Sequence, residues 1–375
     1  MNREFFATAA KGLEEIVAKE LLILGITDSA VETGGVRFSG DMAACYRANL
    51  WLRTANRILM PLIRFHCASP QQLYDGVCTI PWTSYLTPDM TLAVVCNLRD
   101  SSLTHSGFVA LKTKDAIVDS IRDHCGRRPN VSARNPDLLV NIHLFRNQCT
   151  VSLDTSGVGL DKRGYRLEKG EAPLRETLAA AIVALSGWDG TVPLVDPMCG
   201  SGTIPIEAAL LATERPPGLT RPGFGFQRWP GYDATVWQDV LTEARTKVQE
   251  TGGLSISGSD LAINPLKYAK ENSSRAGVGH LITFSNCDIS AVAPPRQPGV
   301  LLVNPPYGVR LGDVSQLETL YRRIGDVMKQ HFTGYSAYVL TGNPQLAKYI
   351  GLKASRRIVL YNGPIECRLL RYELY

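Results

Sequence analysis

The sequence has no segment that is long and apolar enough to cross a membrane, since none reaches about 18 uninterrupted apolar residues. Its first residues, MNREFFATAAKGLEEIVAKELL, place acidic side chains where a secretory signal would be continuously apolar. The nine cysteines form no C-x-x-C pair and no Cys/His set with metal-ligand spacing. These absences predict a cytoplasmic protein with reduced thiols, no membrane partner and no metal.

Charge of either sign is not in large excess, and no run of like charges is present. The chain of 375 residues carries 40 basic and 35 acidic side chains, a formal net charge of +5. Such a mild excess permits a polyanionic partner but does not require one. With 45% hydrophobic and 20% charged residues, the composition predicts two or three packed domains and excludes a disordered or fibrous protein.

Two small α+β units are predicted before residue 160. In residues 1–65, a strand at 3–9 and a helix at 12–25 precede a hairpin at 30–40 and a helix that Asp41 caps. In residues 66–160, alternating apolar residues on both sides of Arg146 and Asn147 predict a hairpin. An amphipathic helix ahead of it carries positive charges that either face solvent or contact an RNA backbone: Lys112, Lys114, Arg122, Arg127, Arg128 and Arg134.

From about residue 172 the pattern changes to alternating strands and helices. Such βα units predict a mostly parallel sheet that is covered by helices and binds its ligand at the carboxyl ends of the strands. We expect the strands at 192–196, 256–260, 282–288 and 300–304. We expect helices at 172–185, with Pro173 in the first turn, and at 202–213 and 262–277.

The turn after the first of these strands, DPMCGSGT (196–203), is rich in glycine. Gly200 and Gly202 allow the backbone to approach a ligand closely, and the helix that follows offers unpaired N–H groups at its N-terminus. Pro205 stands where the dinucleotide fingerprint G-x-G-x-x-G needs its third glycine, and the P-loop signature is absent. The turn therefore favours a ligand other than NAD, FAD or a P-loop nucleotide.

Carboxylates end the next two predicted strands. Asp260 is placed to accept hydrogen bonds from a ribose diol, and Asp288 could accept from the amino group of an adenine. Each acid alone is more readily explained as an ordinary loop cap, because aspartate is common at strand ends. Taken in order at successive strand ends, the two acids indicate a bound nucleoside.

The fourth strand ends in Asn304, Pro305, Pro306 and Tyr307. Proline cannot donate to a strand ladder, so the pair forces the chain out of the sheet and leaves Asn304 and Tyr307 at the strand tip. The amide oxygen of Asn304 and the carbonyl of Pro305 could both accept from a planar amino group of a base. They would thereby favour a pyramidal nitrogen that can attack a methyl donor, while Tyr307 stacks on the extruded base.

These motifs together resemble the class I S-adenosylmethionine-dependent N-methyltransferases. KRGYR (162–166), followed by APLRETLAAAIV, resembles the linker and first helix of the THUMP-domain RNA methyltransferases. The N-terminal stretches GGVRFSGD, LKTKDAIVDSIR and RPNVSARNPDLLVNIHL are similar to the bacterial 23S ribosomal RNA guanine-N2 methyltransferases. In its fused form, that family joins such a unit to a second methyltransferase that makes 7-methylguanine, so this chain is expected to be a stand-alone member or the front half of a fusion.

The resemblance implies an α/β fold in three parts: a ferredoxin-like subdomain at 1–65, a THUMP RNA-binding domain at 66–160 and a Rossmann-like methyltransferase domain at 161–375. It also implies S-adenosylmethionine as cofactor, and 23S ribosomal RNA, protein-free or as an early precursor, as the substrate. The cofactor would be held by Asp196, Pro197, Met198, Cys199, Gly200, Ser201, Gly202, Thr203, Asp260, Leu261, Asp288 and Ile289. The target base would be held by Asn304, Pro305, Pro306 and Tyr307.

Several alternatives stay open at the level of sequence. The Asn-Pro-Pro-Tyr motif also serves DNA adenine-N6 and protein glutamine methyltransferases, and THUMP domains are also used on transfer RNA. The chain could instead be an RNA-binding assembly factor whose methyl transfer is incidental. The stretch 214–237 mixes cations with Phe224, Phe226, Trp229 and Trp237, which is typical either of a nucleic-acid surface or of a loop that buries its own aromatic side chains.

Overall fold

The structure is a computed structural model that describes residues 2–166, 174–250, 252–307 and 314–375. It divides into two compact units. The first comprises residues 1–9, 17–160 and 222–242, and the second comprises residues 10–16, 161–221 and 243–375. Within the described parts of the chain, no helix is both long and apolar enough to span a bilayer. No group of three or more His, Cys, Asp and Glu side chains in those parts is arranged to hold a metal ion.

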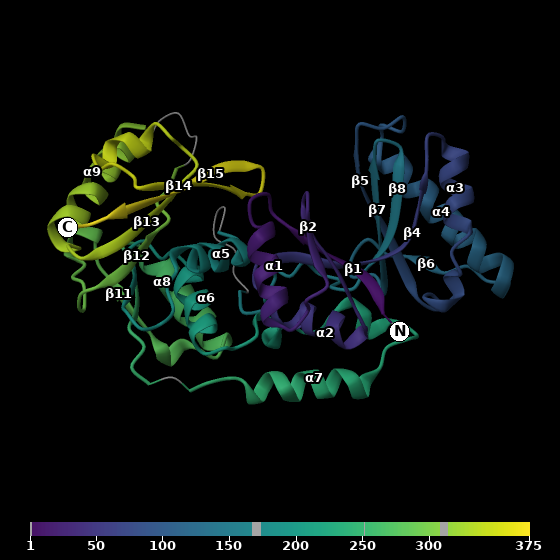
Figure 1. Cartoon of the computed structure of the whole chain (residues 1–375), viewed down its shortest axis with the longest axis horizontal. Coiled ribbons are helices and arrows are strands. Elements are labelled where there is room, and N and C mark those ends of the chain that lie inside the picture. Colours follow the sequence, from purple (N-terminus) through teal and green to yellow (C-terminus); the bar gives the residue numbers. More distant parts are fainter. Residues whose placement is uncertain (1, 167–173, 251, 308–313) are drawn as a thin grey trace. The chain divides into compact units, whose positions relative to one another are not determined.

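The first unit is built on one eight-stranded sheet with the strand order β2-β3-β1-β4-β8-β7-β5-β6. Its strands are β1 (Arg3–Ala9), β2 (Ser29–Glu32), β3 (Gly35–Gly40), β4 (Ala55–His66), β5 (Thr91–Arg99), β6 (Asn130–Val131), β7 (Leu138–Phe145) and β8 (Gln148–Asp154). Its helices include α1 (Glu14–Ile23), whose first residues belong to the second unit, α2 (Met42–Trp51), α3 (Pro70–Cys78), the short η1 (Trp82–Ser84) and α4 (Ser106–Cys125). α3 and α4 lie side by side against the β5 end of the sheet (Figure 1).

Strand β4 joins the two α+β units that the sequence predicts. Its 12 residues pair with β1 on one side and with β8 on the other, so that a single sheet continues from one unit into the next. The local predictions are confirmed: Asp41 caps α2 by accepting from the Ala44 amide at 2.8 Å. Arg146 and Asn147 both have positive φ, at 49° and 60°, as the tightest hairpin turn requires.

The second unit contains a seven-stranded sheet with the order β11-β10-β9-β12-β13-β15-β14, in which β15 runs antiparallel to its neighbours β13 and β14 and all the other pairs are parallel. Its strands are β9 (Leu194–Asp196), β10 (Ile256–Asp260), β11 (Ile282–Asn286), β12 (Gly299–Val303), β13 (Tyr335–Thr341), β14 (Arg356–Asn362) and β15 (Ile365–Glu373). Its helices include α5 (Glu176–Ser186), α6 (Thr203–Ala212), α8 (Ile263–Arg275) and α9 (Val314–His331). Short helical turns follow at η2 (Pro217–Thr220), η4 (Gly279–Leu281), η5 (Ile289–Ala291) and η6 (Leu346–Ile350).

Helices cover both faces of this second sheet. On one face, Tyr321, Met328 and Phe332 of α9 pack in a buried core with Val339 of β13. On the other face, the hydroxyl of Tyr338 donates to the Ser186 carbonyl at the end of α5, at 3.1 Å. Figure 1 shows β12 and β13 between α9 and α5. The predicted Rossmann-like fold is confirmed, whereas Pro173, expected in the first turn of α5, lies outside the described residues.

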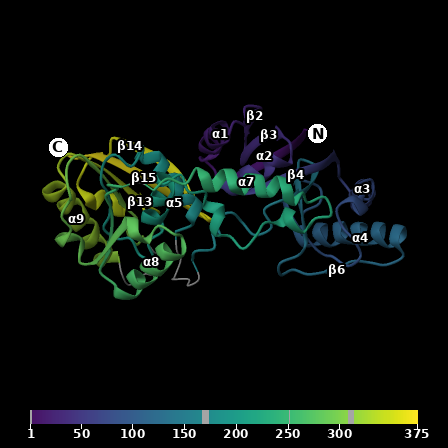
Figure 2. The ribbon, with the colours of Figure 1, turned by 90° about the horizontal axis from the view of Figure 1, so that it is seen from below.

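The aromatic stretch that follows α6 is buried in the first unit. Phe226 of η3 (Gly225–Arg228) stacks on Tyr46 of α2 with ring centroids 4.3 Å apart, and Trp237 of α7 (Ala234–Thr246) meets Tyr46 edge-on at 5.8 Å. Both views show α7 running beside α2 (Figure 1 and Figure 2). Arg228 donates to Asn135 at 3.0 Å. Of the two interpretations of this stretch, the structure therefore supports a segment that buries its own aromatic side chains.

Replacing Phe226 with alanine should destabilise the protein by about 3 to 5 kcal/mol, because the ring is fully buried and its removal leaves a cavity. Urea unfolding measures the change, with the exposed Phe108→Ala of α4 as a control that should shift stability by less than about 0.5 kcal/mol. A Phe226→Ala protein of unchanged stability that binds RNA more weakly would instead support a nucleic-acid contact.

Candidate active site

Three neighbouring parallel strands bring predicted site residues to one edge of the second sheet. β9 lies between β10 and β12, and Asp196 pairs with Gly258 while Val195 pairs with Leu301. Asp260 and Asn304 therefore each lie two residues, roughly 7 Å, beyond the level of Asp196. The turn that follows β9 therefore begins between the ends of β10 and β12, which extend further than β9. The strand order reverses between β9 and β12, which is where open α/β sheets bind their ligands.

The glycines of the turn serve different purposes. Gly200 and Gly202 have φ values of 54° and 81°, which favour glycine. A Cβ atom at Gly202 would lie 3.0 Å from the Cβ of Ala269 in α8, so this position allows helix and turn to pack closely. A Cβ at Gly200 would meet no atom of the described residues within 4 Å. Open space for a ligand therefore lies against Gly200, whose amide donates to Asp260 at 2.9 Å.

Asp196 is the most deeply buried acid of the site, with 1% of its surface exposed. Burial raises its pKa to about 8, with the amide of Met198, 3.2 Å away, opposing the shift and the carboxylate of Asp260 adding to it. The thiol of Cys199 is also buried, and burial raises its pKa far above the ordinary value. Asp196 is thus able to exchange a proton near neutral pH, whereas the Cys199 thiol stays protonated there.

Both carboxylate oxygens of Asp260 accept hydrogen bonds from backbone amides, and the residue that follows Asp260 is apolar. The second carboxylate oxygen of Asp260 accepts from the Ala262 amide at 2.9 Å, and the Asn286 side chain donates to its main-chain carbonyl at 2.9 Å. Leu261, the next residue, is 70% exposed. A large apolar side chain held at a strand end next to a fixed carboxylate is suited to contact the flat face of a base.

Asp288 lies just beyond the end of β11. Its carboxylate accepts from the amide and hydroxyl of Ser290 at 2.9 and 2.7 Å, and it pairs with Arg323 at 3.1 Å. These hydrogen bonds, with the Arg323 guanidinium, lower its pKa, so it is ionised at neutral pH. The neighbouring Ile289 is buried and begins η5. Asp288 is therefore a fixed acceptor whose free lone pairs remain available to an amino group.

Asn304 follows directly after β12 and carries the most informative atom of the site. Its side-chain oxygen is buried and has no hydrogen-bond partner among the described residues. A buried acceptor left without a donor costs about 1 to 3 kcal/mol, so a donor from outside the described residues is expected to reach this oxygen. Pro305 is buried and Pro306 is exposed, and together they end the strand. The orphaned oxygen marks a position where a ligand donor group is expected.

Tyr307 is held in place at its tip and along its ring. Its hydroxyl accepts from the Asn362 side chain at 3.0 Å and lies 3.8 Å from the Cys367 sulfur. Burial raises its pKa to about 12, so it remains neutral. A Cβ at Gly342 would approach the ring to 2.7 Å, which shows how closely the ring packs on the end of β13. Tyr307 therefore offers a rigid aromatic face.

Two buried arginines of the KRGYR segment contact α6. Arg166 donates to the hydroxyl of Thr203, the first residue of α6, and to the Leu174 carbonyl at 3.2 Å. Arg163 pairs with Glu207 at 3.4 Å, and the Tyr165 hydroxyl donates to the same carboxylate at 3.1 Å. From the sequence, this segment is predicted only to be a linker and family signature. No local pattern indicates these contacts, because their partners lie about 40 residues away.

The basic residues predicted around α4 mostly have local partners. The Lys112 ammonium lies 4.6 Å from the ring centre of Tyr74, Arg122 pairs with Asp119 at 3.0 Å, and Arg127 pairs with Asp89 at 2.8 Å. Lys114 pairs with Asp115. These contacts are typical of a solvated face, so any RNA contact by this helix would compete with them.

The sequence matches three known families. Residues 163–371 match the family described as the RMKL-like methyltransferase domain, residues 4–59 the RlmL ferredoxin-like domain, and residues 67–154 the THUMP domain. These matched ranges fall within the three domains predicted at 1–65, 66–160 and 161–375.

Individual relatives match this chain over its whole length. The ribosomal RNA large subunit methyltransferase K/L of Methylococcus capsulatus is 46% identical over 100% of this chain and 52% of its own length. A Synechocystis protein provisionally named as an RNA methyltransferase is 43% identical over 100% of this chain and 97% of its own. The crystal structure of SMU.472, provisionally named as a methyltransferase and solved with SAH, has a TM-score of 0.89 at 33% identity and covers 100% and 98% of the two chains. The chain thus spans about half the length of the K/L relative.

Proposed function

This chain belongs to the family of RMKL-like methyltransferases with an N-terminal ferredoxin-like and THUMP pair, and from that membership we propose its reaction. We propose that it transfers a methyl group from S-adenosylmethionine to the exocyclic N2 amine of a guanine in 23S ribosomal RNA. The observation that carries this proposal is the orphaned, buried side-chain oxygen of Asn304. An amino group of a flipped base supplies the donor that this oxygen lacks.

The cofactor-binding residues fit an adenosyl ligand with an amino-acid tail. Gly200 faces open space, the N-terminus of α6 begins at Thr203, and the acids Asp260 and Asp288 lie at successive strand ends. We assign the turn 196–203 to the methionine end, Asp260 to the ribose and Asp288 to the adenine amine. Leu261 and Ile289 would contact the two faces of the adenine. The relative SMU.472, solved with SAH, supports this class of ligand.

The chain's own residues make the amine reactive and orient it. The lone pair of a guanine amino group is delocalised into the ring, which makes the group a poor nucleophile. The Asn304 side-chain oxygen and the Pro305 carbonyl accept hydrogen bonds from its two N–H groups and favour a pyramidal nitrogen, while Tyr307 stacks on the base. The bound cofactor supplies an electrophilic methyl group. A nitrogen–carbon bond forms as the sulfur–carbon bond breaks, and the cationic nitrogen then loses a proton to water, so no strong base is needed.

RNA as the substrate class is supported by the THUMP match and by the relatives named as ribosomal RNA methyltransferases. A second methyltransferase domain, fused or separate, is part of the proposal as a partner. The stage of action would be protein-free or early precursor 23S RNA, in the cytoplasm. The domain bounds 1–65, 66–160 and 161–375 also stay a proposal.

The substrate class is tested by methyl transfer from labelled S-adenosylmethionine to unmodified 23S RNA, 16S RNA, transfer RNA and DNA. The proposal expects label in 23S RNA alone. Label in transfer RNA would favour a transfer-RNA guanine-N2 enzyme, and label in DNA would favour an adenine-N6 enzyme. Absence of label in all four, with 23S RNA still bound, would favour an RNA-binding assembly factor.

Binding of S-adenosylhomocysteine should release a proton near neutral pH. The raised pKa of Asp196, about 8, keeps its carboxyl mostly protonated at pH 7, and the ammonium group of the ligand would favour the ionised form. Calorimetry in buffers of different ionisation enthalpy measures the release, and affinity should rise between pH 6 and pH 8. Asp196→Asn should abolish the release. Equal binding enthalpies in all buffers would place the ligand ammonium away from Asp196.

The same pKa has a consequence for the protein without ligand. Asp196 binds its proton more tightly when folded than when unfolded, where the pKa is about 3.9. Its contribution to stability is therefore fully present at low pH and declines as pH rises from about 4 to about 8. Asp196→Asn should flatten this part of the stability profile.

A further inference from the structure

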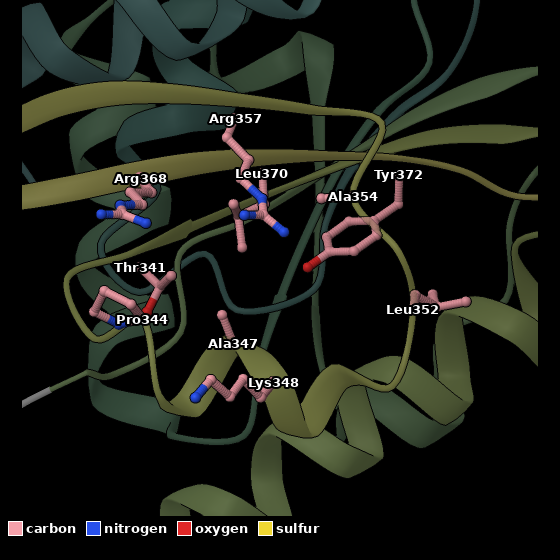
Figure 3. A pocket seen from close by; sticks show the side chains of 10 residues that line it. All are labelled: Thr341, Pro344, Ala347, Lys348, Leu352, Ala354, Arg357, Arg368, Leu370 and Tyr372. Atoms are coloured by element: carbon pink, nitrogen blue, oxygen red, sulfur yellow. The ribbon is translucent and has the colours of Figure 1, made fainter.

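A cleft of about 400 Å³ opens at the end of β13 in the second unit. Its walls come from the end of β13, from β14 and β15, and from η6, as Figure 3 shows. Three cationic side chains line it: Lys348 from η6, Arg357 from β14 and Arg368 from β15. Thr341 and Tyr372 add hydroxyl groups, and in Figure 3 the Tyr372 hydroxyl points into the cleft.

Like Arg356, these three cations have no carboxylate partner among the described residues. Nearby, Arg371 pairs with Glu373 at 2.6 Å and Arg322 with Glu318 at 3.9 Å. Three unpaired positive charges around one cleft repel each other and form a site for an anion.

The strand pairing explains why the two arginines share one face. In antiparallel strands, directly paired residues point to the same side, and Arg357 pairs with Leu370 whereas Arg368 pairs with Thr341. Leu370 and Arg368 are two residues apart on β15 and therefore share a face. Arg356, the residue before Arg357, points to the opposite face together with its pair Arg371.

The cleft lies one strand away from the proposed base site, across β13. β13 runs parallel to β12, with Val339 beside Val303, so Thr341 lies one residue beyond the level of Asn304 on the neighbouring strand. The ring of Tyr307 packs on Gly342, the residue that follows Thr341. A base that enters the Asn304 site leaves its sugar and phosphates outside, within reach of the adjoining surface.

We propose that this cleft is a subsite for the RNA backbone phosphates that flank the methylated nucleotide, a proposal that rests on the proposed function. Arg357 and Arg368 supply planar donors that match phosphate oxygens, and Lys348 supplies a point charge. Burial raises the pKa of Tyr372 to about 12, against the opposing charge of Arg357, so its hydroxyl stays a donor. The subsite adds binding energy next to the base and thereby offsets the cost of flipping it.

The test compares the wild type, the double variant Arg357→Gln/Arg368→Gln and the control Arg356→Gln. Affinity for unmodified 23S RNA is measured by filter binding over a series of salt concentrations, together with kcat, KM and the Kd for S-adenosylhomocysteine. The double variant should bind RNA on the order of tenfold more weakly, with a salt slope smaller by about 1.4, since each single-strand phosphate contact contributes about 0.7. KM for RNA should rise while the Kd for S-adenosylhomocysteine stays constant.

The control keeps the comparison specific. Arg356→Gln removes one positive charge from the same strand on the opposite face, and it should leave affinity and slope nearly unchanged. A double variant whose RNA affinity and slope equal those of the control would overturn the proposal. Binding of guanosine monophosphate is measured with the same proteins. If the double variant binds this nucleotide more weakly than the wild type but binds RNA equally well, the cleft is a free-nucleotide site and the RNA proposal is wrong.

Failure of this proposal can be told apart from failure of the proposed function. If the wild type methylates 23S RNA and the double variant behaves as the control does, only the phosphate subsite is wrong. If no RNA is methylated by any of the proteins but RNA affinity falls only in the double variant, the subsite stands and the methyl-transfer proposal is wrong.

Discussion

Asn304→Ala should lower kcat for methyl transfer by about 10² to 10³-fold, because in the proposed function it removes the oxygen that accepts a hydrogen bond from the reacting amine. The buried side-chain oxygen has no hydrogen-bond partner among the described residues, so its loss breaks no described contact of the fold. We therefore expect the folded protein to be as stable as the wild type or slightly more stable. Single-turnover methyl transfer to 23S RNA measures the effect on chemistry separately from product release.

Two comparisons make this result specific. Asn304→Asp keeps an oxygen acceptor of the same shape and should retain more activity than Asn304→Ala. The Kd for S-adenosylhomocysteine should be unchanged in both variants, since Asp196 and Asp260 lie on other strands. An Asn304→Ala enzyme with wild-type kcat would show that the amine is held elsewhere. A variant that lost its affinity for the cofactor would place Asn304 in the cofactor site.

Glu207→Ala should destabilise the second unit by about 3 to 5 kcal/mol, the usual cost of removing one partner from a buried ion pair. Arg163 is only 2% exposed and pairs with Glu207 at 3.4 Å, and the Tyr165 hydroxyl donates to the same carboxylate. The substitution leaves a buried guanidinium and a buried hydroxyl without that acceptor. The midpoint of urea unfolding, followed by a probe in the second unit, measures the change.

An exposed ion pair provides the control for Glu207. Lys247 pairs with Glu243 at 2.8 Å on the surface of α7, and Glu243→Ala should change stability by less than about 1 kcal/mol. The double variant Arg163→Met/Glu207→Leu should recover most of the lost stability, because neither charge then remains buried. A Glu207→Ala protein as stable as Glu243→Ala would mean that water reaches Arg163 and that the pair does not support α6.

Local signals in the sequence predicted much of this structure. Asp41 at a helix start, positive-φ residues at the tip of a hairpin and alternating strands and helices after residue 172 all encode contacts between residues close in the chain. The order of strand-end motifs could also be predicted, because parallel strands bring their carboxyl ends to one edge. This is why the sequence alone predicts that Asp196, Asp260 and Asn304 lie at one edge of the sheet.

Contacts between distant segments could not be predicted in this way. The long strand β4 joins the two predicted α+β units into one sheet, and its own sequence does not indicate that it pairs with β1 and β8. The aromatic residues after α6 match a nucleic-acid surface as well as a core, and only the packing of Phe226 on Tyr46 decides between them. The cationic cleft combines a short helical turn with two strands, so its charges are scattered along the sequence.

Nucleoside analysis of the methylated RNA tests the central claim most directly. The purified chain would be incubated with unmodified 23S RNA and S-adenosylmethionine, and the digested product would be analysed by mass spectrometry against authentic methylated nucleosides. The proposed function predicts N2-methylguanosine as the product, formed by the wild type and lost in Asn304→Ala. N6-methyladenosine or 7-methylguanosine in its place would contradict the assignment of the Asn304 site to the guanine amine.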